Sequence, residues 1–285
     1  MTSYSNKWKK KKLSNMIITA VLLVAGLLMV APFIYMISVS LERTANLIPP
    51  FPPRIIPEDL SSFNYMLAFE SGEIITAYLN SFITTSGGVI LGVITSLLGG
   101  YAFSKGNFKG KKVIFVIVLS TMMIPFQTRL IPMHRMFYNF GLTNTYWAII
   151  LPRMLDGFGI LLCKQFFDQL PNSLREAAQI DGGTELNIFR RVFLPLTGPI
   201  TATLVILSFM ACWNDFLWPL IALTKNSLQT IPVYMSSFAT QDSNGYLAGL
   251  TMATATLSIL PIVLVFLALQ KYIIESIALS GIKGE

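Results

Sequence analysis

Charged residues are scarce in this sequence. Only 12% of its 285 residues are Asp, Glu, Lys or Arg, whereas soluble proteins carry about a quarter. Hydrophobic residues make up 53% of the chain. A soluble globular domain rarely combines so little charge with so much apolar surface, because the apolar surface would have no core large enough to hold it. The composition therefore predicts a membrane protein.

Histidine and cysteine are also rare. His134 is the single histidine, which excludes a catalytic or metal site that needs several of them. Cys163 and Cys212 lie in separate apolar runs, so they indicate no disulfide framework, and zinc sites need ligands clustered at short spacing. We therefore expect no metal site and no catalytic residue in this chain.

Nucleotide-binding and hydrolytic motifs are missing as well. The stretch most similar to a phosphate-binding loop is GNFKGKK at residues 106–112. It lacks the GxxxxGK[ST] spacing of the loops whose backbone amides surround phosphate. Neither a GxSxG elbow nor an HExxH pair is present. If ATP drives this protein, another chain must bind it. We expect a protein that is not an enzyme and that carries no cofactor of its own.

Six apolar runs are long enough to cross a bilayer, which takes about 20 residues. The first, 16–40, is longer than the roughly 7–15 residues of a secretory h-region, so it predicts an uncleaved first helix. Prolines then exclude a helix from residues 49–57, which we interpret as an external loop. The pattern predicts an all-α polytopic membrane protein with six transmembrane helices. The further spans are predicted at 76–103, 113–132, 146–167, 197–223 and 245–270.

Basic residues indicate the orientation of these spans. The net charge of +7 is more typical here of membrane orientation than of nucleic-acid binding. With six alternating spans, most of the 21 Lys and Arg residues fall on the side of the N-terminus. Because cytoplasmic loops are enriched in Lys and Arg, both termini are expected in the cytoplasm, together with the polar segment at 173–195.

Two patterns inside the spans predict contacts. Small residues recur at every fourth position of the second span, and small residues let helices approach closely in lipid. Packing within the chain's own bundle is the favoured interpretation, and dimerisation is the alternative. In the fourth span, Arg153 and Asp156 are placed to pair on one helical face. The small residues are Gly88, Gly92, Ser96 and Gly100.

The polar segment 173–195 predicts two short helices joined by a glycine turn. Ser173 and Glu176 have the spacing of a capping box. The run 181–183, Asp-Gly-Gly, favours the left-handed conformation that ends a helix. Thr184 is placed to cap a second helix that extends through Arg191. On the aqueous side of a membrane protein, such a rigid protrusion is a surface for a partner.

A second candidate site is a polar path through the membrane. Trp213, Asn214 and Asp215 combine an aromatic ring, an amide and a carboxylate, which suits a polyol. The alternative is an aromatic belt with a hydrated Asp215 near the outer interface. Thr254 and Ser258 share a face of the sixth span, where they either line the same path or hydrogen-bond between helices.

The polar segment resembles a known motif. Glu176-Ala177-Ala178, then Gly182, then Leu194-Pro195 are spaced as in the EAA loop of importer-type ABC permeases, EAA-x3-G-x9-I-x-L-P, with Val192 in place of isoleucine. Further stretches are similar to carbohydrate importers of the kind represented by the G subunit of the maltose transporter. They are Asn64-Tyr65, Asn80-Ser81, residues 101–104, 123–125, 141–145, 213–220 and 281–284.

The resemblance covers essentially the whole chain and implies the transmembrane domain of a type I ABC importer in a bacterial inner membrane. It implies a homologous second permease, two ATPase subunits that bind ATP and magnesium, and an external solute-binding protein. It also divides the chain into 1–70, a transmembrane core at 71–272 with the loop 173–195, and a cytoplasmic tail at 273–285. The residues implied to couple to the ATPase are Glu176, Ala177, Ala178, Asp181, Gly182, Leu194 and Pro195.

The implied function is ATP-driven import of a sugar or oligosaccharide. An importer for an amino acid, a peptide or another polyol is the nearest alternative. A stand-alone secondary transporter and a membrane-anchored assembly protein are further alternatives from other classes. Arg153 and Asp156 depart from the family, whose fourth span is usually uncharged, and this departure leaves open an acidic or large substrate.

Overall fold

The backbone is helical, as predicted. The structure is a computed structural model that describes residues 2–47, 52, 54–70, 72–240 and 247–281. Over those residues the chain forms helices and connecting loops, and its only extended pairing is an isolated bridge between Glu42 and Leu60. The part of the expected external loop at 48–51 and 53 lies outside the described residues, and no helix forms from 54 to 61.

Five stretches of helix are long and apolar enough to cross a membrane, and a bent pair of helices makes a sixth. The six-span prediction is confirmed in this sense. The five stretches are Ser14–Ser40 in α1 (Thr2–Ser40), α3 (Glu73–Lys105), Tyr146–Asp168, Glu185–Trp213 and Ala248–Lys271 in α13 (Ala248–Gly281). The short elements that connect these stretches are η1 (Arg43–Asn46), α2 (Phe63–Glu70), η5 (Asn226–Leu228) and α12 (Ile231–Thr240).

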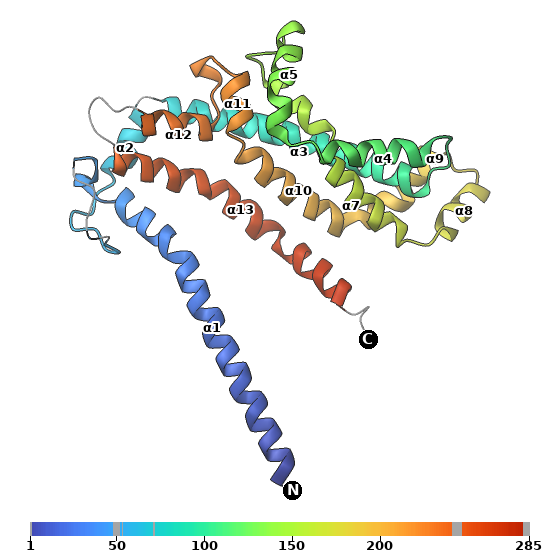
Figure 1. Cartoon of the computed structure of the whole chain (residues 1–285), viewed down its shortest axis with the longest axis horizontal. Coiled ribbons are helices and arrows are strands. Elements are labelled where there is room, and N and C mark those ends of the chain that lie inside the picture. The colour runs from blue at the N-terminus through green and yellow to red at the C-terminus, as the bar shows by residue number, and fades with distance from the viewer. Residues whose placement is uncertain (1, 48–51, 53, 71, 241–246, 282–285) are drawn as a thin grey trace. The chain divides into compact units, whose positions relative to one another are not determined.

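The third span is not the single helix predicted at 113–132. α4 (Lys111–Met122) ends before Pro125, and α5 (Phe126–Asn139) begins directly after it at an angle of 102° to α4. Proline lacks an N–H and keeps the preceding residue out of the helical region, so the helix cannot continue through this point. Figure 1 shows α5 standing away from the line of α4.

The fourth span is also interrupted, and the predicted pair between Arg153 and Asp156 is wrong. α6 (Tyr146–Ile150) is followed by a 3-10 turn, η2 (Leu151–Met154), and α7 (Gly157–Asp168) begins anew. Asp156 caps α7 by accepting a hydrogen bond from the Phe158 N–H at 3.1 Å. Because no α-helix runs through residues 151–156, Arg153 and Asp156 do not share a helical face.

The fifth span ends earlier than the predicted residue 223. α10 (Gly198–Trp213) stops at Trp213, and α11 (Leu217–Ala222) follows after a short break. Asn214 and Asp215 therefore lie in the break between two helices rather than inside one. The sixth span ends at Lys271, close to the predicted residue 270, while its helix α13 continues to Gly281.

The chain divides into two compact units, residues 1–71 with 237–257 and residues 72–236 with 258–285. In the first unit a fully buried Asn64 ties the end of α1 to the turn that follows. Its amide donates to the carbonyls of Ser40 and Glu42 at 3.0 and 2.9 Å, and its oxygen accepts from Asn46 at 2.7 Å. The sequence-based division at residues 70 and 272 concerns function and stays a prediction.

In the second unit α3 packs against both α7 and α10. The small residues of α3 are buried at these contacts. A Cβ added at Gly100 would lie 2.2 Å from the Cβ of Cys163 on α7, and one at Gly88 would lie 3.1 Å from the Sγ of Cys212 on α10. The predicted packing of this face within the chain's own bundle is therefore confirmed.

Candidate functional site

The polar segment 173–195 folds into a series of short helical elements. They are α8 (Ser173–Ile180), α9 (Glu185–Ile188), a π-helical turn η3 (Phe189–Phe193) and a 3-10 turn η4 (Leu194–Thr197), which leads directly into α10. The second helix thus continues past the predicted end at Arg191. We call α8, α9 and the glycine turn between them the knob (residues 173–188).

The first helix of the knob begins at Ser173 as predicted, but the capping box is wrong. Asn172 occupies the N-cap with helical backbone angles, so Ser173 is already inside the helix and cannot cap it. A buried lysine fixes this end of α8 instead. The Nζ of Lys105, at the end of α3, donates to the Leu170 carbonyl at 2.6 Å and to the Asn172 side chain at 2.8 Å.

The glycine turn has the geometry that the sequence predicts. Gly182 adopts a φ of 79°, in the left-handed region that favours glycine. The Gly182 and Gly183 N–H groups donate to the carbonyls of Gln179 and Ala178 at 3.0 and 2.9 Å, which satisfies the last carbonyls of α8. The Thr184 hydroxyl then accepts from the Asn187 N–H at 3.4 Å, so the predicted cap of the second helix is confirmed.

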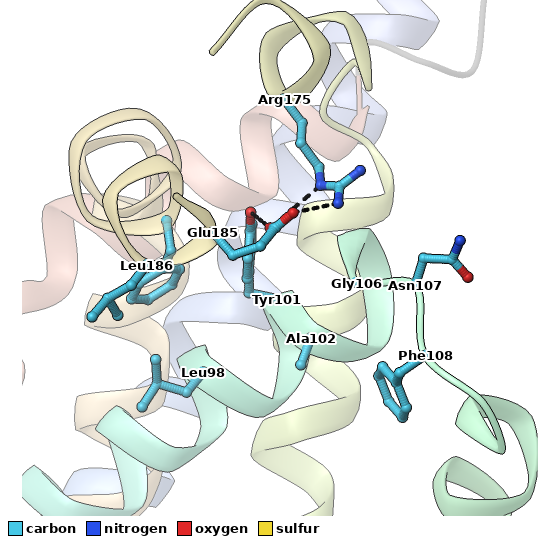
Figure 2. A pocket seen from close by; sticks show the side chains of 10 residues that line it. Leu98, Tyr101, Ala102, Gly106, Asn107, Phe108, Arg175, Glu185 and Leu186 are labelled. Carbon is cyan, nitrogen blue, oxygen red and sulfur yellow. Dashed lines mark hydrogen bonds and ion pairs between the residues drawn. The ribbon is translucent and has the colours of Figure 1, made fainter. Parts of the chain in front are cut away.

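One carboxylate holds the knob against the membrane bundle. Glu185, on α9, accepts a hydrogen bond from the Tyr101 hydroxyl on α3 at 3.0 Å and from the Gln179 side chain on α8 at 3.0 Å. It also forms an ion pair with Arg175 on α8. Figure 2 shows Arg175 and Tyr101 converging on Glu185 along one wall of a pocket. The hydrogen bond to Glu185 raises the pKa of Arg175 above its usual value.

The Tyr101 ring anchors this network in a buried aromatic cluster. Its centroid lies 5.7 Å from Phe167 on α7, and 5.2 Å from both Phe189 and Phe193 in η3. Such edge-on and tilted pairs add about 0.5–1.5 kcal/mol each beyond the area they bury. Tyr101 therefore joins a rigid apolar core to the polar underside of the knob. The same side chain serves both, with the ring in the core and the hydroxyl on Glu185.

The outer side of the knob is exposed and partly apolar. Ile180 is 86% exposed and Leu186 is 67% exposed. Leu186 also lines the pocket of Figure 2, whereas Ile180 does not. Exposed apolar residues on an otherwise polar surface are typical of a protein contact. Of the residues predicted to couple to an ATPase, only Ala178 packs against the core. The others, Glu176, Ala177, Asp181, Gly182, Leu194 and Pro195, are exposed.

Sequence reasoning did not select Tyr101, Arg175 or Glu185. Arg175 and Gln179 are one helical turn apart, so their shared face could have been read from the sequence. Tyr101 lies 84 residues from Glu185, and no spacing rule links them. The contact depends on how α3 packs against the start of the fifth span.

The residues predicted for a polar path differ in their surroundings. Trp213 is 3% exposed, stacks on Phe209 at 5.5 Å and donates to the Ser258 carbonyl at 3.0 Å. Thr254 is fully buried, and its hydroxyl donates within α13 to the Leu250 carbonyl. Asn214 is exposed and Asp215 is partly buried. The role of these residues in transport stays a prediction.

Residues 88–278 match the profile of a protein family described as binding-protein-dependent transport system inner membrane component. That stretch includes the knob, its anchoring network around Glu185 and Tyr101, the second half of α3 and the last four spans. It covers well over half of the chain.

Similar proteins include sugar permeases and an importer of known structure. The chain is 35% identical to the arabinooligosaccharides transport system permease protein AraQ of Halalkalibacterium halodurans over 80% of this chain and 81% of that protein. It is 31% identical to the lactose transport system permease protein LacG of Rhizobium radiobacter over 93% of this chain and 96% of that protein. A crystal structure of a bacterial ABC transporter involved in import of the acidic polysaccharide alginate matches with a TM-score of 0.81 and 26% identity, over 90% of this chain and 95% of that one.

Proposed function

The chain belongs to the family of binding-protein-dependent transport system inner membrane components, which are transport permeases of ABC importers and not enzymes, and from this membership we propose that its cargo is a sugar or oligosaccharide. The named sugar permeases among its relatives support a saccharide over an amino acid or peptide. An external binding protein delivers the saccharide, and the chain forms part of the path into the cytoplasm.

The coupling role is carried by one observation, the attachment of Glu185 on α9 to both α8 and α3. We propose that the exposed side of the knob docks on a cytoplasmic ATPase subunit. A conformational change passes only through elements that move together. Because Glu185 links α8 and α9 to α3, a displacement of the knob also displaces the hydroxyl end of Tyr101 and the aromatic cluster beneath it.

The remaining assembly follows the family's organisation. The permease family implies a partner permease, an ATPase and a binding protein. We propose one homologous permease and two ATPase subunits, which bind ATP and magnesium. Both termini and the knob lie in the cytoplasm in this proposal, as the distribution of Lys and Arg supports.

Residue roles in the proposal are divided between the two candidate sites. The exposed residues of the knob make the ATPase contact, while the exposed Leu194 and Pro195 border it. Asn214 and Asp215 face the solute path. The buried Trp213, whose indole N–H donates to the carbonyl of the partly buried Ser258, supports the helices that form it. Thr254 is assigned to the same path from the sequence pattern. The coupling residues are Glu176, Ala177, Ala178, Asp181, Gly182, Leu194 and Pro195.

Reconstitution tests the function. The complete assembly, with its ATPase and binding protein, is placed in proteoliposomes, and uptake of labelled arabinotriose, raffinose and trigalacturonic acid is measured with and without internal ATP. The proposal expects ATP-dependent uptake of at least one saccharide. Uptake by this chain alone, without any ATPase, would instead indicate a stand-alone carrier. Failure to move any saccharide while moving an amino acid or peptide would overturn the cargo assignment.

A further inference from the structure

The break in the fourth span places an arginine near the middle of the membrane. A Cβ added at Gly92 would lie 2.9 Å from the carbonyl oxygen of Arg153, and one at Gly88 would lie 3.3 Å from the Cγ of Arg153. Both glycines are close to the midpoint of α3, a helix of 33 residues. At about 1.5 Å per residue, such a helix spans the bilayer with a turn or more to spare at each end. Arg153 is therefore at mid-depth.

Arg153 is only partly satisfied there. Its Nη2 donates to the Asp215 carboxylate at 2.5 Å and to the Ala211 carbonyl at 3.2 Å. The side chain of Arg153 is 32% exposed and that of Asp215 is 13% exposed. The Nε and Nη1 groups of Arg153 have no hydrogen-bond partner among the residues that the structure describes. The ion pair thus leaves donors available at a partly open position.

A second carboxylate follows three residues later. One oxygen of Asp156 accepts from the Phe158 N–H, and no cation pairs with the group within the described part of the chain. Its other oxygen and the Ser96 hydroxyl both face Gly159, where a Cβ would lie 2.8 and 2.3 Å from them. Arg153 lies beside Gly88 and Gly92 of α3, and Asp156 lies beside Gly159 with Ser96, which is one helical turn further along α3. Together with Asp215, the breaks in the fourth and fifth spans bring one guanidinium, two carboxylates and a hydroxyl to neighbouring positions.

A purely structural role does not account for all of these groups. Ionisable side chains inside a membrane are costly, and they characteristically mark the route of a polar solute. An ion pair that only closed the bundle would explain Asp215 and Nη2, but it would leave the other donors of Arg153 and the Asp156 carboxylate without a use. Unpaired donors and acceptors side by side suit hydroxyl groups, which both donate and accept.

We propose that Arg153, Asp156 and Asp215 form a subsite at mid-depth for the hydroxyl groups of a neutral saccharide. The inference rests on the proposed function, since it names a part of the same solute path. One positive and two negative charges repel a carboxylate. The structure thus favours a neutral saccharide, although the sequence alone left an acidic one open. The alginate importer resembles this chain in fold, but a similar fold does not imply that this chain also transports an acidic polysaccharide.

Arg153→Lys is the test. Lysine keeps the charge opposite Asp215 but lacks the free Nε and Nη1 donors. In proteoliposomes with the complete assembly, we expect the KM for raffinose or arabinotriose to rise about tenfold, as expected for the loss of a hydrogen bond to a charged group. The maximal rate and the basal ATPase activity should stay within about twofold of wild type, as expected for lost ground-state binding. Asp156→Asn retains the α7 cap and should raise the same KM.

The matched control is Arg129→Lys, on the exposed face of α5, where KM should not change. Unchanged KM values in both Arg153→Lys and Asp156→Asn would overturn the subsite, as would wild-type transport of trigalacturonic acid in preference to both neutral sugars. If Arg153→Lys does not assemble with its partners, Asp156→Asn decides alone. Wild type that moves no saccharide refutes the proposed function itself, whereas wild-type uptake with insensitive variants refutes only the subsite.

Discussion

Replacement of Glu185 by Gln should uncouple ATP hydrolysis from transport while leaving the bundle folded. Glutamine keeps one acceptor oxygen, which cannot serve the Tyr101 hydroxyl and the Gln179 amide as the two carboxylate oxygens do, and it loses the ion pair with Arg175. Glu185 is exposed, so the lost pair is worth only about 0.2–1 kcal/mol. The lost hydrogen bond to the carboxylate adds about 1 kcal/mol at this exposed position.

The magnitude of the effect follows from these contributions. A loss of about 1–2 kcal/mol in the link between knob and bundle corresponds to a decrease of about 5- to 30-fold in the population that moves as a unit. The core beneath it is untouched, because the aromatic cluster around Tyr101 does not include Glu185. We therefore expect membrane insertion and thermal stability close to wild type, together with a several-fold decrease in sugar uptake per ATP hydrolysed.

The assay is a double-mutant cycle with Tyr101→Phe, which removes the hydroxyl and keeps the ring in the cluster. Uptake and ATP hydrolysis are measured in parallel for both single variants and the double variant. If the network acts as one unit, the double variant is much less impaired than the sum of the singles. Strict additivity, or uptake per ATP equal to wild type in Glu185→Gln, would refute the role assigned to the network.

Three further substitutions probe the knob and the bundle. Gly182→Val places a β-branched residue at a φ of 79°, so we expect normal membrane insertion but no transport-coupled ATP hydrolysis. The control is Gly198→Ala, whose added Cβ would meet nothing within 4 Å. Wild-type uptake in Gly182→Val would exclude a coupling role for the turn. Ile180→Ser should weaken ATPase binding in a pull-down without lowering the melting temperature, since the side chain is 86% exposed; undiminished binding would move the contact elsewhere. Gly100→Val should lower the melting temperature by several degrees, because even its Cβ would lie 2.2 Å from a cysteine Cβ on α7. Gly26→Val, whose Cβ would lie in open space, should not lower it. Equal melting temperatures of the two variants would contradict the close approach of α3 and α7.

Much of the fold could be predicted from composition and spacing. Apolar runs of membrane length, the glycine turn at Gly182 and the cap at Thr184 are local features, and each depends on residues within a few positions of one another. The close packing of α3 was equally readable, because small residues at every fourth position mark one face wherever the helix goes. The family motif in 173–195 identified the outer surface of the candidate site for the same reason.

Local patterns failed where proline or a neighbouring helix decided the outcome. Pro125 divides the third span, and the break at 151–156 separates Arg153 from Asp156. The capping box failed because Lys105, 67 residues away from Asn172, holds the start of α8.

Sequence by itself determined that this chain is a helical membrane permease with a protruding polar segment at 173–195, because those properties follow from hydrophobicity and from short motifs. Only the tertiary structure decided that Tyr101 reaches Glu185 and that Arg153 pairs with Asp215, 62 residues further along the chain. Both contacts join separate spans at points where helices end or break. The packing of whole helices against one another decides which side chains meet at these points. The periodicity of residues along a single helix does not predict that packing.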